Sequence, residues 1–158
     1  MPDRTALLLQ ILDQAFDRKA WHGTTLRGAL RGLTPEVALW RPAPDRHNVW
    51  ELLLHAAYWK YIVRRKLTRD ASLSFPRSPS NFPAIPEVAD AKALKADLAL
   101  LGAEHRALRE VVASFPDRQL DELAEGSKWT HLEFIHGAAA HDLYHAGQIQ
   151  LLKRLRGG

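Results

Sequence analysis

The sequence contains no cysteine among its 158 residues. This absence excludes disulfides, thiolate zinc sites, iron–sulfur clusters and a cysteine nucleophile. A transition metal bound by this chain would therefore depend on histidine nitrogens and carboxylate oxygens. Any reactive thiol in its chemistry would have to come from a cosubstrate.

The chain also lacks long apolar runs and a strong excess of one charge. No run approaches the roughly 20 residues of a membrane span, and the N-terminus has no apolar segment of a signal peptide, so we expect a cytoplasmic protein without a membrane partner. A net charge of +4 does not indicate a nucleic-acid partner. The basic clusters fall at expected helix C-termini, where cations complement the helix dipole: Arg64, Arg65, Lys66 and Arg69, then Lys153, Arg154 and Arg156.

Alternating strand-type runs are absent as well, and apolar residues recur at helical spacing instead. The spacing predicts long helices over residues 3–19, 48–68, 90–114 and 131–155, with shorter helical pieces over residues 24–32 and after Thr34. Asn48 with Glu51, and Thr130 with Glu133, have the spacing of capping boxes and mark two of the helix starts. The proline-rich residues 72–86 predict a long irregular connection.

These elements predict an all-α protein, a four-helix bundle with a long crossover connection between its second and third helices. The length suits one ordinary domain with a full core. We find no internal repeat and expect a single domain over residues 1–158.

Histidine is abundant, with eight residues, and its placement on the fourth long helix needs an explanation. His141 and His145 are four residues apart, so their rings lie on one face, one turn from each other. That face is the apolar stripe of the helix, where two imidazoles need either a metal or a hydrogen-bonded polar network. His55 faces inward on the second long helix and is the natural third ligand. Three nitrogens with an open position would make a catalytic-type metal site.

The other histidines have weaker claims to a function. His105 occupies a core position on the third long helix, where a buried structural role competes with that of a fourth ligand. His22 lies in a break after the first helix and is placed to line the mouth of the site. His47 precedes a helix N-cap. His131 lies in the first turn of its helix, where a surface and a buried position are equally open, and we expect His136 at the surface or at a subunit contact.

Two segments that contain the candidate ligands resemble the DinB/YfiT-like metalloenzyme family. The sequence HDLYHAGQI over residues 141–149 is similar to the HxxxHxGQI signature of that family. The sequence NVWELLLH over residues 48–55 is similar to the helix that ends in the first metal histidine. Residues 21–23 and 33–36 also look like family segments, whereas the resemblance is loose between residues 72 and 125.

The resemblance implies a four-helix bundle that binds one divalent metal, zinc or nickel, through His55, His141 and His145. It also implies a homodimer, for which a second apolar strip on the fourth helix is available: Leu132, Ala139 and Leu143. Relatives include S-transferases that use bacillithiol, mycothiol or glutathione, and an isomerase of the same kind. The expected partner is therefore a small-molecule substrate, with a low-molecular-weight thiol as cosubstrate.

Two functions follow from a three-histidine metal site. In a metal-dependent S-transferase or hydrolase, the metal would activate a thiol or a water molecule. Glu51 would then act as a base or orient a ligand, unless it pairs within its own helical turn, and Tyr144, Gln148 and His22 would contact substrate. The alternative is a non-catalytic, stress-response bundle with a structural or vestigial site, closed by a group such as His105 or Glu51.

Overall fold

The computed structural model describes residues 3–157, and within that range the chain is helical, with no β-strand. The all-α prediction is confirmed. The long helices are α1, α4, α5 and α6, and shorter helical segments are α2, α3 and the 3-10 turn η1. Their bounds are α1 Arg4–Phe16, α2 Leu26–Ala29, α3 Pro35–Leu39, α4 Val49–Thr68, α5 Ala91–Ala113, η1 Asp117–Gln119 and α6 His131–Gly157.

The helix starts follow the capping residues of the sequence. The Asn48 side chain accepts from the Glu51 amide at 2.9 Å, and the Glu51 carboxylate accepts from the Asn48 amide at 3.2 Å. Thr130 and Glu133 exchange the equivalent pair of bonds at the start of α6. Both predicted capping boxes are confirmed, and they satisfy amides that have no partner within the helix.

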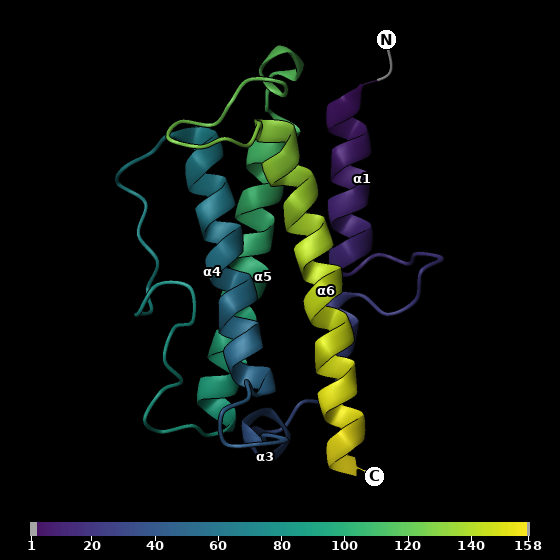
Figure 1. Ribbon diagram of the computed structural model, residues 1–158, viewed down its shortest axis with the longest axis vertical. Coiled ribbons are helices and arrows are strands. Elements are labelled where there is room, and N and C mark those ends of the chain that lie inside the picture. Colours follow the sequence, from purple (N-terminus) through teal and green to yellow (C-terminus); the bar gives the residue numbers. More distant parts are fainter. Residues whose placement is uncertain (1–2, 158) are drawn as a thin grey trace.

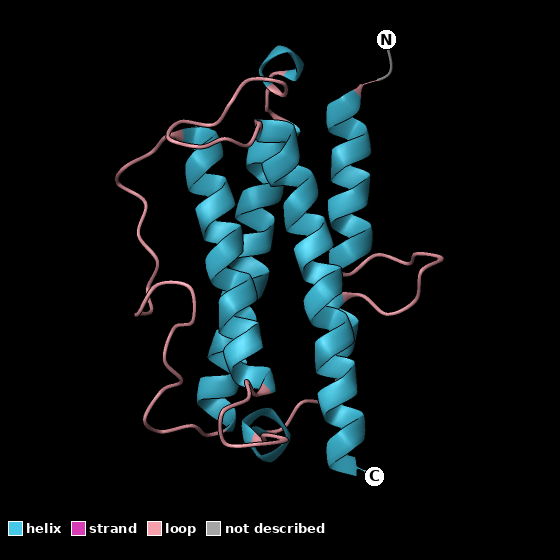
Figure 2. Ribbon diagram, in the orientation of Figure 1, coloured by secondary structure: helices cyan, strands magenta, loops and turns pink. Residues whose placement is uncertain are grey.

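The long helices lie side by side (Figures 1 and 2). α4 packs against α5 and α6, and α1 packs against α5 and α6. Residues 69–90, which join α4 to α5, contain no helix or strand and pass along the outside of α4 (Figure 1). None of the helices in the described part of the chain is both long and apolar enough to cross a membrane.

A layer of polar side chains separates two apolar clusters in the core. One cluster includes Leu52, Leu53, Leu54, Ala56 and Ala57 of α4 and Ile149 of α6, whereas the other includes Val63 of α4 and Ile135 of α6. On α4, α5 and α6, the buried residues between the two clusters carry polar groups: Lys60 and Tyr61 on α4, Glu104 and His105 on α5, and Asp142 and His145 on α6. Burying polar groups costs free energy unless they have partners. A layer of buried polar groups is therefore a candidate functional site.

An ion pair between α4 and α6 lies in this layer. Lys60 Nζ donates to Asp142 Oδ2 at 2.5 Å, and the side chains are 2% and 1% exposed. The Lys60 ammonium also lies 5.0 Å from the centroid of the Phe16 ring. The other carboxylate oxygen, Asp142 Oδ1, has no hydrogen-bond partner within residues 3–157. No role for Lys60 or Asp142 was predicted from the sequence.

His105 takes the structural position that the sequence allowed. Its ring stacks on Phe16 with centroids 3.7 Å apart, and burial lowers its pKa to about 3. His131, whose position the sequence left open, is buried: its Nδ1 donates to the Gln119 carbonyl at 2.8 Å, and its ring packs on Phe115. The first residue of α6 is thus held against the segment that contains η1.

The strip expected at a homodimer contact is covered by the chain itself. Ala139 is buried, and Leu132 and Leu143 are partly buried against the apolar cluster that includes residues of α1. These residues therefore do not form the free face that the dimer prediction assumed. The homodimer stays a prediction, and this strip does not support it.

Candidate metal centre

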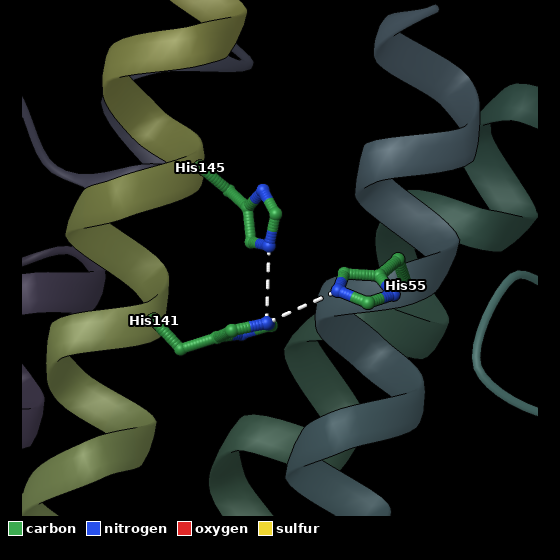
Figure 3. A group of neighbouring side chains, drawn as sticks. All are labelled: His55, His141 and His145. Carbon is green, nitrogen blue, oxygen red and sulfur yellow. Dashed lines mark hydrogen bonds between the residues drawn. The ribbon is translucent and has the colours of Figure 1, made fainter. Parts of the chain in front are cut away.

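Three histidine rings from two helices meet beside the polar layer (Figure 3). His55 extends from α4, and His141 and His145 extend from successive turns of α6. His141 Nε2 lies 3.1 Å from His55 Nε2 and 3.0 Å from His145 Nε2. One nitrogen of each ring can be chosen so that all three lie within 4.8 Å of one another. The structure thus brings together the three residues that the sequence singled out.

The outward-facing nitrogens of two rings are held by carbonyl oxygens. His55 Nδ1 lies 2.7 Å from the main-chain oxygen of Asn81, and His145 Nδ1 lies 2.6 Å from Gln148 Oε1. A carbonyl oxygen can only accept a hydrogen bond, so Nδ1 carries the proton in both neutral rings. The Nε2 atoms of both rings therefore present lone pairs toward His141. Carbonyl acceptors of this kind orient metal-ligating histidines in proteins generally.

Burial keeps the three rings neutral. It lowers the pKa of His55 to about 4, and together with the neighbouring His145 and His55 it lowers that of His141 to about 3. Burial also lowers the pKa of His145. At pH 7 no proton has to leave these rings before they can bind a cation.

The donor set fits a transition-metal ion. Three neutral nitrogens converge, although His141 Nε2 can donate a proton to only one of its two neighbours at a time. Two nitrogens bound about 2.1 Å from one tetrahedral ion lie about 3.4 Å apart, close to the separations seen here. A cation would satisfy all three lone pairs together, whereas a hydrogen-bonded arrangement leaves one without a donor.

The connection between α4 and α5 contributes to this centre through Asn81. Asn81 has a φ of 70°, a left-handed conformation that asparagine adopts more readily than most residues. In this conformation its main-chain oxygen meets His55, and its side-chain Oδ1 accepts from Trp59 Nε1 at 2.8 Å. The neighbouring Phe82 stacks on His55 and on His47, with centroids 4.1 Å apart in each case. Periodicity could not reveal this contribution, because residues 69–90 have no regular structure.

We expect Asn81→Val to weaken metal binding about 10- to 100-fold. This loss is usual when a metal-binding histidine loses the group that accepts a hydrogen bond from its other ring nitrogen. A β-branched residue does not tolerate a φ of 70°, so the carbonyl should move away from His55. Asn81→Gly keeps the conformation and the carbonyl, and should stay within about threefold of the wild type. Zinc titration against a chromophoric chelator measures both affinities. Equal affinities for the two variants would contradict a role of the Asn81 carbonyl.

Glu51 lies one turn before His55 but is bound to other groups. Its carboxylate accepts from Arg41 at 2.5 and 2.8 Å, lies 3.0 Å from His47 Nδ1, and caps α4 through Asn48. Burial raises the pKa of Glu51, but the hydrogen bonds from Arg41 first, and then from His47 and Asn48, lower it to about 2. With these contacts Glu51 forms an ion pair and caps α4. This agrees with the alternative in which Glu51 pairs near the start of its helix and does not act as a base.

The three residues expected to contact substrate have different surroundings. Gln148 holds His145 in place, and Tyr144 packs edge-on against the His145 ring, with centroids 5.1 Å apart, while remaining 65% exposed. His22 is exposed in the loop between α1 and α2, which projects beyond α6 on the side away from α4 (Figure 1). The structure therefore places Gln148 and Tyr144 beside the centre, whereas His22 belongs to a loop on the other side of α6.

A pocket of about 350 Å³ adjoins the centre between α4 and α6. We call it the α4–α6 pocket; its lining includes Trp59, Val63, Trp129, Phe134, Gly137 and His141. One of the three histidines thus also forms part of a pocket wall. The volume lies at the small end of the range for ligand pockets.

A family model supports the relationship that the histidine segments indicated. The model described as the DinB superfamily matches residues 19–149, a range that contains all three histidines of the centre. The chain belongs to the DinB superfamily. Neither a curated protein nor a solved structure gives a significant match to this DinB-superfamily chain. The family match and the cluster of three histidines agree, since all three residues lie within the matched range.

Proposed function

We propose that this DinB-superfamily protein is a metal-dependent enzyme, a small-molecule S-transferase or hydrolase whose metal is bound by His55, His141 and His145. The observation that carries the proposal is the convergence of three neutral Nε2 atoms at 3.0 and 3.1 Å, with two of the rings fixed from outside. We also infer that the long helices form the four-helix bundle of this family, with residues 69–90 as its crossover connection.

Zinc or nickel suits an all-imidazole donor set. When bound, such an ion supplies a Lewis acid that makes a water molecule or a thiol sulfur more nucleophilic at neutral pH. The thiol would be a cosubstrate of the bacillithiol, mycothiol or glutathione type, because the chain has no cysteine.

The residues of the chain orient the reacting groups and restrict access to them. Asn81 and Gln148 fix the ligand rings, and Phe82 covers one face of His55. Tyr144 is exposed next to His145, where its hydroxyl can meet a bound cosubstrate. Glu51 is occupied by Arg41 and stabilises the start of the helix that carries His55.

The proposal is tested on untagged protein in two steps. Native mass spectrometry should find one divalent metal per chain, and turnover should then be measured with thiol and electrophile pairs and with simple esters and amides. We expect turnover by the metal-loaded protein and none after chelation, with recovery on adding zinc or nickel back. A protein that binds metal but turns over none of these compounds would favour the non-catalytic alternative, and a protein without metal would refute the site.

A further inference from the structure

The α4–α6 pocket is apolar over most of its wall. Trp59 and Val63 contribute from α4, Phe134 and Ala138 from α6, and Trp129 from the loop before α6, where it is half exposed. Aromatic and aliphatic walls of this kind favour a ligand with a large apolar surface. His141 belongs to the same wall, so a molecule in this pocket would lie next to the proposed metal centre.

Apart from His136, which is exposed to solvent, the charged and titratable residues that line the pocket, other than the ring of His141, already have partners. Glu133 accepts from the Thr130 amide and hydroxyl at 2.7 and 2.9 Å. Lys60 and Asp142 are paired with each other through Asp142 Oδ2 and are almost completely buried, and Asp142 Oδ1 has no hydrogen-bond partner within residues 3–157. A charged ligand would lose its hydration in an apolar pocket without gaining an unpaired carboxylate or ammonium group as counter-charge, which is unfavourable. An uncharged ligand does not meet this cost.

Gly137 leaves open space at the wall of this pocket. A Cβ atom built at Gly137 meets no heavy atom within 4 Å, outside its chain neighbours and the backbone of its own helix. A larger side chain at this position would extend into the pocket rather than into the core. The same absence of neighbours holds at Gly147, which is exposed on α6 and does not line the pocket.

We propose that the α4–α6 pocket binds an uncharged, largely apolar molecule of aromatic type, with one end against His141. This inference rests on the proposed function, since it makes that molecule the substrate of the metal centre. It names the class of substrate: a neutral aromatic compound rather than a carboxylate, a phosphate or an amine.

The binding test uses 2-naphthol as a neutral probe and 2-naphthoate as its anionic counterpart, titrated into the metal-free protein and followed by nitrogen–proton NMR. We expect 2-naphthol to shift the Gly137 amide and the Trp129 indole signals in a saturable way. We expect 2-naphthoate to bind at least about tenfold more weakly, because its carboxylate loses hydration. Equal binding of the two probes would overturn the assignment to uncharged ligands.

Gly137→Leu should weaken 2-naphthol binding at least about tenfold by filling the pocket. Gly147→Leu is the matched control, since it makes the same change in the same helix and should leave binding within about twofold. Leucine is a better helix former than glycine, so neither variant is expected to unfold. Unchanged binding in Gly137→Leu, or equal losses in both variants, would place the ligand elsewhere and refute the proposal.

A second measurement separates this inference from the proposed function. With cobalt(II) loaded in place of zinc, the proton signals of bound 2-naphthol should broaden, because the pocket adjoins His141. Binding without broadening in a cobalt-loaded protein would refute the placement beside the metal. If the protein takes up no metal, the proposed function fails, and the metal-free titration alone decides whether the pocket binds this class of molecule.

Discussion

Replacing His141 by alanine should reduce the zinc affinity of the protein by more than about 100-fold, a larger loss than that expected for a residue outside the ligand set. His141 Nε2 lies between the Nε2 atoms of His55 and His145, within 3.1 and 3.0 Å of them. Its removal leaves two nitrogens with no third ligand between them. Calorimetric titration of zinc into metal-free protein, with a competing chelator for the wild type, measures the difference.

A stability measurement gives an independent readout of the same change. An ion that binds only the folded state stabilises it by about 4 kcal/mol when its concentration is 1,000 times the dissociation constant. Zinc should therefore raise the melting temperature of the wild type and leave that of His141→Ala almost unchanged. His136→Ala is the matched control, because His136 is exposed five residues earlier on the same helix. A wild-type response in His141→Ala would show that zinc binds elsewhere.

The sequence predicts what depends on local spacing. The four-residue separation of His141 and His145 puts both rings on one face of any α-helix, whatever surrounds that helix. The capping boxes at Asn48 and Thr130 also depend only on residues three apart, and the structure contains both. For the same reason the bounds of α4 and α5 lie within one residue of those predicted.

Contacts that depend on several elements at once were not predictable in this way. Asn81 reaches His55 from a segment without periodicity, so no spacing rule connects the two residues. Asp142 lies away from the ligand face on a helical wheel, which left it without a role. Because α6 packs against α1, α2 and α4, more than one of its faces is buried, and Asp142 meets Lys60 inside the core. A wheel with a single buried face cannot describe such a helix.

The Lys60–Asp142 pair should therefore dominate the stability of the polar layer. Lys60→Met leaves the Asp142 carboxylate buried without a partner, which should lower the free energy of unfolding by about 3–5 kcal/mol. The double variant Lys60→Met/Asp142→Leu removes both charges and should recover most of that loss. Urea denaturation of Lys60→Met, Asp142→Leu, the double variant and the wild type gives the coupling energy between the two residues. Arg27→Met, which breaks the exposed pair with Asp17, should change stability by less than about 1 kcal/mol.

The pH dependence of this loss distinguishes an unpaired charge from a simple packing defect. Burial raises the pKa of Asp142, whereas Lys60 lowers it, so the pKa should rise further in Lys60→Met. A carboxyl group whose pKa is raised by folding is neutral in the folded state below that pKa. It destabilises the folded state only when the pH rises through that pKa and the group becomes charged. The difference in stability between Lys60→Met and the wild type should consequently be larger at pH 8 than at pH 5.5. An equal difference at both values would mean that the methionine disturbs packing and that the carboxylate is not left charged.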